Sequence, residues 1–192
     1  AIRPLWRTRA VGVAGTARYL PFQGRVPEAT PAAYLKWSGW YYENVCTYPW
    51  MQQVGEGDFV VIDQSGVNAG LMGSENTLTA LRRGVRGFVS NGGVRDTDEV
   101  ILQEIPFWSR IVSQGMVQTR LQFDQMDVPV CVGGQTVCPG DIVVADGDGV
   151  VIVPRAIAAE VAKYGQEEHA RDKKNRRKHY DDLGKPPDDT VA

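Results

Sequence analysis

Two kinds of hydrophobic pattern divide the chain. In the middle, short apolar runs typical of buried strands alternate with segments in which apolar residues recur every three or four positions, as on one face of a helix. This pattern predicts strands at 11–19, 58–63 and 87–90 and helices at 74–83 and 96–102. Ser74 is expected to be the N-cap of the first helix, and Gly84 lies just after its last turn. Strands that alternate with helices predict parallel βαβ units.

After Pro106 the hydrophobic period changes to two, which is typical of strands with one buried face. Strands are expected at 111–117 and 119–123, followed by a hairpin of 128–132 with 135–137 and another of 141–145 with 150–153. The pair Gly133-Gly134 suits the tight turn of the first hairpin. A last helix is expected from Arg155 onward, and it leads into a charged tail that ends near Pro186-Pro187.

The aromatic-rich stretch 32–54 is expected to be helical in part, with Pro49 interrupting or ending a helix. The fold class predicted from all these segments is α/β: a single compact α/β/β-type domain with central parallel βαβ units and C-terminal antiparallel hairpins. With 192 residues, 43% of them hydrophobic, the chain is long enough for one core and too short for two large ones. We expect the domain to cover residues 1–165 and a charged helix and tail to cover 166–192.

Charge and hydropathy exclude two classes of partner. The net charge of -2 lacks the basic excess that normally meets a phosphate backbone, so nucleic-acid binding is not expected as the main function. No apolar run approaches the roughly 18 residues of a membrane span, and no signal-peptide pattern is present. We therefore expect a soluble, cytoplasmic protein. The chain begins at Ala1, without a methionine, as expected of a truncated or processed polypeptide.

The three cysteines, Cys46, Cys131 and Cys138, match no metal-ligand spacing. Their odd number indicates free thiols in a reducing compartment. In the predicted hairpin, Cys131 lies opposite Thr136, so it is not expected to pair with Cys138. We expect all three to be buried or half-buried thiols.

Several familiar motifs are absent. Neither a GxxxxGK[ST] phosphate loop nor a GxGxxG turn after a strand is present, so nucleotide binding has no support. The segment Asp146-Gly147-Asp148-Gly149 has a calcium-loop likeness, but Val150 stands at the next ligand position, which favours a tight hairpin turn. Both histidines, His169 and His179, lie in the charged C-terminal region, which argues against a histidine triad. Carboxylates and arginines remain the candidates for chemistry.

Two predicted strand ends carry such groups. Gly73 permits close approach of a ligand to the backbone, and the amides of Ser74, Glu75 and Asn76 at a helix N-terminus form an anion site. Arg95 follows the next strand, where it can grip a carboxylate with two hydrogen bonds, and Asp96 can hold Mg²⁺. Taken alone, Arg95-Asp96 is more simply a surface arginine beside a helix N-cap. The neighbouring turn favours a binding site for a small anion and a metal.

Several segments lie at a distinctive spacing: Gly73-Ser74-Glu75-Asn76, Gly84, Gly87-Phe88-Val89, Gly93-Val94-Arg95-Asp96, Pro139-Gly140-Asp141, and Asp146-Gly147-Asp148-Gly149-Val150 to Pro154. In these segments the chain resembles the RraA-like family, which includes 4-hydroxy-4-methyl-2-oxoglutarate aldolases and the regulator of ribonuclease E activity. The resemblance covers roughly residues 55–165. It implies a compact α/β/β-type fold assembled as a homotrimer or hexamer, with the site near a subunit interface.

The resemblance also implies roles for individual residues. Gly73, Ser74, Glu75, Asn76 and Arg95 would bind a pyruvate-like 2-oxo acid, Asp96 would ligate Mg²⁺ or Mn²⁺, and Arg95, Asp96 and Glu75 are the candidate catalytic residues. The implied reaction is that of a metal-dependent lyase that forms a pyruvate enolate. Aldol cleavage of 4-hydroxy-4-methyl-2-oxoglutarate type substrates and decarboxylation of oxaloacetate both fit this chemistry.

The chain departs from the family pattern in three places. Ser74 stands where the aldolases commonly have Asp, and a serine is no base at neutral pH without help; Glu75 is a substitute from the next position. A further acidic residue is expected from the C-terminal region of a neighbouring subunit, with Glu167 and Glu168 as candidates. The helical segment that usually precedes the first strand is absent.

Two other functions stay open. A non-catalytic regulator that binds a ribonuclease or RNA partner is indicated by residues 163–180, which carry seven Lys or Arg against three Asp or Glu; a solvated helix is the simpler interpretation. A related enzyme for a larger, sugar-derived oxo acid is indicated by an aromatic cluster, although packing is the commoner use of aromatic residues. The cluster comprises Trp37, Trp40, Tyr41, Tyr42, Tyr48 and Trp50.

Overall fold

A computed structural model describes residues 1–26 and 30–191. Its strands are β1 (Arg3–Pro4), β2 (Ala10–Pro21), β3 (Asp58–Asp63), β4 (Gly70–Met72), β5 (Gly87–Val94), β6 (Phe107–Val112), β7 (Leu121–Met126), β8 (Val130–Val132), β9 (Gln135–Val137), β10 (Ile142–Ala145) and β11 (Val150–Val153). The α-helices are α1 (Pro31–Asn44), α2 (Ser74–Leu81), α3 (Thr97–Leu102) and α4 (Ala158–Asp182), and short 3₁₀ turns cover Pro49–Gln52 and Arg155–Ile157. The predicted α/β fold class is confirmed.

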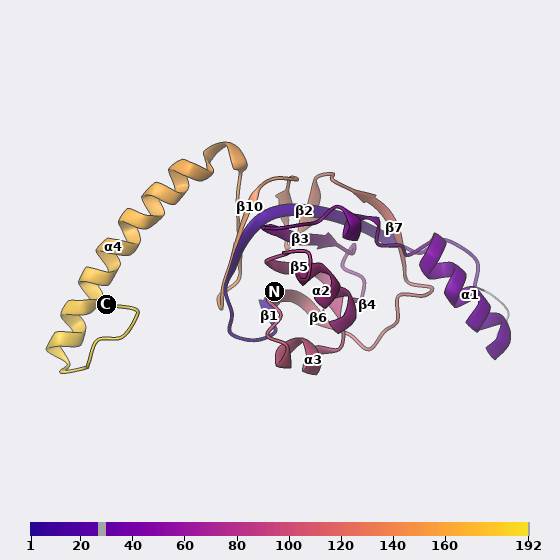
Figure 1. Ribbon diagram of the computed structural model, residues 1–192, viewed down its shortest axis with the longest axis horizontal. Helices are drawn as coiled ribbons and strands as arrows, with labels where there is room; N and C mark the ends of the chain where they lie inside the picture. The colour runs from indigo at the N-terminus through magenta and orange to yellow at the C-terminus, as the bar shows by residue number, and fades with distance from the viewer. Residues whose placement is uncertain (27–29, 192) are drawn as a thin grey trace. The chain divides into compact units, whose positions relative to one another are not determined.

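The main sheet is mixed, with a parallel centre and antiparallel edges. Its strand order is β1-β6-β5-β3-β2-β10-β11, while β4 pairs with β5 and β7 pairs with β2. The pairs β2–β3, β3–β5, β4–β5 and β5–β6 are parallel. Strands β8 and β9 form a separate hairpin sheet. Figure 1 shows α2 and α3 beside β4, β5 and β6, as expected of crossover helices in βαβ units.

Both faces of the sheet are buried at its centre. In β3 the side chains of Val60 and Ile62 join the core cluster that includes α2 and α3 residues, whereas Phe59 and Val61 join the cluster on the other face, under β8, β9 and β10. Alternate residues of a strand point to opposite faces, so a strand covered on both sides is apolar throughout. This is why the run at 58–63 could be predicted as a strand, and the prediction is confirmed.

The described chain divides into two compact units, Ala1–Ile152 and Val153–Ala192. The first contains both sheets and the helices α1 to α3. The second contains α4, a 25-residue helix with no buried residue. Among the described residues, no helix is both long and apolar enough to cross a membrane.

Several predicted boundaries are wrong. Gly73, and not Ser74, is the N-cap of α2, and Ser74 is its first helical residue. Strand β5 continues to Val94 through a register shift between Ser90 and Gly93, so the glycine-rich run there is strand and not turn. Residues 113–120, expected to lie largely in strands, form a loop between β6 and β7.

Of the predictions for the cysteines, the hairpin register is confirmed and the burial is partly wrong. Cys131 pairs with Thr136, as predicted, so Cys131 and Cys138 do not face each other across the hairpin. All three cysteines are free. Only Cys46 is buried; Cys131 and Cys138 are exposed, and the prediction that they are buried is therefore wrong. A β-hairpin with one solvent face alternates buried and exposed positions, and Cys131 falls on the exposed one between Val130 and Val132.

Candidate functional site

The parallel pairing of β4 with β5 places two strand-to-helix loops side by side. Gly70 pairs with Gly93 and Met72 with Val94, so both strands end at the same edge of the sheet. The amide of Arg95 donates to the carbonyl of Met72 over 2.9 Å and fastens the second loop to the first. Carboxyl ends of neighbouring parallel strands are where open α/β sheets bind their ligands.

Asp96 connects the two loops. Its Oδ2 accepts a hydrogen bond from the backbone amide of Ser74 over 3.2 Å. Asp96 has the left-handed backbone conformation, with φ 54° and ψ 40°, and makes no side-chain cap on α3. Asp96 thus occupies the N-cap position of α3, as the simpler interpretation expected, but its side chain bonds to the other loop and does not cap α3. The carboxylate faces the N-terminus of α2, where negative charge is favoured.

Gly73 is required by this arrangement for steric reasons. A Cβ on Gly73 would lie 2.2 Å from Asp96 Oδ2 and 3.1 Å from Arg95 Cγ. Its φ of -144° is ordinary extended backbone, so the constraint is space and not conformation. The glycine lets the carboxylate approach the start of α2.

The guanidinium of Arg95 lies beside the same two loops and makes few contacts with the described chain. Its Nε is 4.0 Å from Asp96 Oδ2, and its Nη1 lies 3.2 Å from the sulfur of Met116 in the loop after β6. Nε is buried without a hydrogen-bond partner among the described residues. The side chain as a whole is 31% exposed, so its outer nitrogens remain open to an anionic ligand.

The N-terminus of α2 contributes fewer free amides than predicted. The Ser74 amide is occupied by Asp96, whereas the amides of Glu75 and Asn76 have no acceptor within the described backbone. The hydroxyl of buried Thr77 donates to the Gly73 carbonyl over 2.8 Å and holds the turn. The Asn76 amide group points inward, 3.5 Å from the carbonyl of Leu71.

Glu75 does not join the cluster. It is exposed, and no hydrogen bond or ion pair within the described part of the chain connects it to Arg95 or Asp96. A helix of 3.6 residues per turn directs adjacent side chains about 100° apart, so Glu75 leaves the turn in another direction from its neighbours. Ser74, the other departure from the family pattern, contributes its amide to Asp96.

Tyr48, predicted only as one of six clustered aromatic residues, contacts the first of the two loops. Its hydroxyl donates to the Leu71 carbonyl over 2.9 Å and also hydrogen-bonds with the Asn76 side chain. Burial raises the pKa of Tyr48 well above its usual value, with the positive charge of Arg95 acting weakly in the opposite direction. Tyr48 is therefore a neutral hydrogen-bond donor that joins the end of β4, at Leu71, to the first turn of α2, at Asn76.

Most of the aromatic cluster packs in the core. Tyr41 and Trp50 are buried, and Trp37 and Tyr42 pack against the same core cluster. Only Trp40 is substantially exposed, at 51%. Packing, the commoner use of aromatic residues, accounts for them, and Tyr48 alone contacts the site.

The charged C-terminal residues lie in the second unit. His169 and His179 are exposed on α4, as predicted, and so are Glu167 and Glu168. Within the part of the chain that the structure describes, no three His, Cys, Asp or Glu side chains gather as a metal cluster. Within the described residues, Asp96 is the carboxylate that forms an ion pair with Arg95.

A match to a known family accompanies this geometry. Residues 1–152 match the model of the RraA-like family, described as Aldolase/RraA. The chain belongs to the RraA-like family. The predicted resemblance is thereby confirmed.

Two curated relatives show how varied this RraA-like group is. A Burkholderia mallei protein, named provisionally as a 4-hydroxy-4-methyl-2-oxoglutarate aldolase, is 32% identical over 150 residues, which is 75% of this chain and 88% of the relative. Protein DlpA of Legionella pneumophila is 28% identical over 163 residues, or 84% of this chain. The chain spans only about a quarter of DlpA, at 24% of its length.

A solved structure extends the comparison to the regulators. Streptomyces coelicolor RraAS2, described as an unusual member of the RNase ES inhibitor RraA protein family, superimposes with a TM-score of 0.73 at 27% identity; the match covers 92% of this chain and 81% of that one. The family therefore contains proteins named as aldolases and proteins named as ribonuclease inhibitors.

Proposed function

We propose that the chain is a divalent-metal-dependent lyase that acts on a 2-oxo acid through a pyruvate enolate. The observation that carries the proposal is the meeting of Arg95 and Asp96 at the N-terminus of α2, with a buried guanidinium nitrogen that has no partner. Aldol cleavage of 4-hydroxy-4-methyl-2-oxoglutarate type substrates and oxaloacetate decarboxylation are the candidate reactions.

Arg95 is assigned to the substrate carboxylate. The Arg95 side chain is 31% exposed, so its outer guanidinium nitrogens can reach the carboxylate, and the amides of Glu75 and Asn76 supply neutral donors nearby. A guanidinium keeps its charge throughout the accessible pH range and binds carboxylates in a fixed geometry. It therefore orients the oxo acid and favours the extra negative charge of the enolate over the ground state.

Asp96 is assigned to Mg²⁺ or Mn²⁺. Only its Oδ2 accepts a hydrogen bond from the described chain, which leaves Oδ1 for a cation. One carboxylate fits Mg²⁺, which commonly takes one or two protein carboxylates and fills its remaining positions with water and substrate. The chemistry that such a cation supplies is stabilisation of negative charge developing on the substrate oxygen.

No further carboxylate of the described chain is ion-paired with Arg95, and the proton-transfer group is proposed to come from a neighbouring copy. We assign it to Glu167 or Glu168 of a neighbouring copy in a trimer or hexamer. Both are exposed on α4, where Glu168 also forms an ion pair with Arg171 of the same helix. Glu75 is not the preferred base, because no hydrogen bond or ion pair among the described residues joins it to Arg95 or Asp96.

The test measures pyruvate release from 4-hydroxy-4-methyl-2-oxoglutarate and from oxaloacetate, with Mg²⁺ or Mn²⁺ and with a chelator. Removing one group that stabilises developing charge commonly costs about 10²- to 10³-fold in rate, so Arg95→Ala and Asp96→Asn should each lose at least that much. Asn is chosen because it tolerates the left-handed backbone of Asp96.

Arg86→Ala is the matched control. Arg86 is exposed, pairs with Glu56 and lies outside the site, so its loss should leave turnover unchanged. Equal turnover by the wild type, Arg95→Ala and Asp96→Asn would refute the assignment of these residues. Activity that survives the chelator would refute the metal.

A regulator that binds a ribonuclease or RNA partner is the second candidate, and one observation favours it. Helix α4 is exposed along its length and carries the basic run at 163–180. Within it, ion pairs join Arg171 to Glu168, Arg176 to Asp172 and Arg177 to Asp181. Salt-sensitive partner binding that disappears on deletion of 163–192, together with no turnover of any oxo acid, would favour this role.

A further inference from the structure

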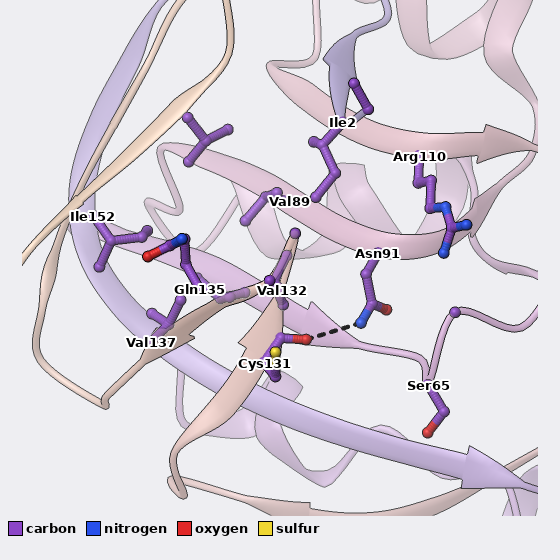
Figure 2. Close-up of a pocket in the computed structure, with 16 residues that line it drawn as sticks. Ile2, Ser65, Val89, Asn91, Arg110, Cys131, Val132, Gln135, Val137 and Ile152 are labelled. Atoms are coloured by element: carbon purple, nitrogen blue, oxygen red, sulfur yellow. Dashed lines mark hydrogen bonds between the residues drawn. The ribbon is translucent and has the colours of Figure 1, made fainter.

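A cavity of about 690 Å³ lies on the face of the sheet opposite α2 and α3. Val61 of β3 and Val89 of β5 form its floor, and they belong to the core cluster on that face. Val132 and Val137 of the β8–β9 hairpin and Ile152 of β11 form further walls (Figure 2). None of the residues at the Arg95–Asp96 site lines this cavity, so the two are separate.

The other end of the cavity is polar. Figure 2 shows Arg110, Asn91 and Ser65 together on one side, away from Ile152 and Val137. Strand periodicity explains the placement of Arg110, since it lies two residues after Trp108, whose side chain packs on the same face.

The polar groups around Arg110 are already satisfied by one another. The Asn91 side chain donates to Asp63 Oδ1 over 2.7 Å and to the Cys131 carbonyl over 2.9 Å, and its Oδ1 accepts from the Gln64 amide over 2.7 Å. Asp63 also accepts from the amides of Ser65 and Cys131, over 2.8 and 3.3 Å. These bonds fasten the hairpin to β3 and β5.

Arg110 differs from these neighbours. No hydrogen bond or ion pair joins its guanidinium to any part of the described chain, and Asp63 is committed to other donors. Its Nη1 lies 3.2 Å from where a Cβ on Gly66 would stand, and Gly66 also lines the cavity. At the other end, Ile152 and Val137 lie beside the Gln135 side chain (Figure 2). A positive group at one end and a mainly aliphatic wall at the other match a molecule with one carboxylate and a short apolar body.

We infer that this cavity is a second ligand site, for a small monocarboxylic acid with a branched aliphatic or aromatic tail. Arg110 would bind the carboxylate with two parallel hydrogen bonds, and the tail would lie among Val61, Val89, Val132 and Ile152. The volume is within the range of about 300–1,000 Å³ typical of small-molecule sites, which are mostly apolar with few polar anchors. The site does not depend on the proposed lyase reaction.

The test is isothermal titration of the chain with 3-methylbutanoate and phenylacetate, neither of which is a 2-oxo acid. Each acid is compared with the alcohol of the same carbon skeleton, 3-methylbutan-1-ol or 2-phenylethanol. Both acids should bind, and each alcohol should bind at least about tenfold more weakly because it lacks the charge that Arg110 meets. Methyl resonances of Val61, Val89 and Val132 should shift on saturation.

Two variants separate this cavity from the candidate active site. Arg110→Gln should weaken acid binding about tenfold or more, and it should fold normally because Arg110 is exposed. Arg95→Gln should leave acid binding unchanged. Unchanged binding in Arg110→Gln, loss of binding in Arg95→Gln, equal binding of acid and alcohol, or no binding of either acid at millimolar concentration would each overturn the inference.

Discussion

Gly73→Ala tests the geometry of the candidate site at its most crowded point. The added Cβ would stand 2.2 Å from Asp96 Oδ2, and carbon–oxygen contacts normally stay above about 3 Å, so the carboxylate must retreat by about 1 Å. The hydrogen bond from the Ser74 amide, 3.2 Å long, is lost in that movement. Displacement of a reacting group by this much commonly costs about 10²-fold in rate.

The same substitution has a smaller effect on stability. Overpacking lowers the free energy of unfolding by about 1–3 kcal/mol. Replacing Gly with Ala at an ordinary extended position raises it by about 0.4–1 kcal/mol, because the unfolded chain has fewer conformations. A net loss of about 1–2 kcal/mol, or a melting temperature lower by about 2–8 °C, is expected for a chain of this size. The variant should thus be folded at 25 °C while its pyruvate release falls about a hundredfold.

Urea unfolding and pyruvate release, measured on the same preparation, check both parts. Gly39→Ala is the matched control, because Gly39 lies within α1 with no atom within 4 Å of its Cβ position. It should raise the free energy of unfolding by about 0.5–1 kcal/mol and leave turnover unchanged. A Gly73→Ala protein with wild-type stability and wild-type turnover would show that Asp96 is not held against Gly73.

Three further outcomes are expected. Tyr48→Phe should lower the free energy of unfolding by about 1 kcal/mol in urea titrations, because the Leu71 carbonyl loses its buried donor. A thiol reagent at pH 8 should modify Cys131 and Cys138 in the native protein and Cys46 only after denaturation; reaction of all three at equal rates would contradict the structure. Burial raises the pKa of Cys46 to about 12, so the unfolded state ionises first; the free energy of unfolding should fall as pH rises from about 9 toward 12, and less steeply in Cys46→Ala.

The central strand and the hairpins could be predicted because their signals are local. Strand β3 is apolar on both faces, and the β8–β9 turn carries two glycines at positive φ. Strand β4 was missed, since three residues show no period and its partner β5 is distant in sequence. The end of β5 was misplaced because the Gly92-Gly93 run also suits a turn.

The sequence allowed the main residues of the candidate site to be predicted, but not the contacts that they make. Arg95 and Asp96 stood out by chemistry and family likeness, but an Asp before a helix predicts an N-cap, and nothing local reveals a left-handed φ. Tyr48 reaches the site from a 3₁₀ turn 23 residues before Leu71, a tertiary contact without a sequence pattern. Arg110 gave no signal at all, because only the strand register places it in the cavity.

The crowding around Gly70 and Gly93 bears on how the site would receive a ligand. A Cβ on Gly70 would lie 2.8 Å from Arg95 Cβ, and one on Gly93 would lie 2.5 Å from the Ala69 carbonyl oxygen. Backbones at this separation leave the two loops no room to shift independently. The site is thus preorganised: the ordering cost of binding is met when the protein folds, and structures with and without an oxo acid should superimpose at these loops.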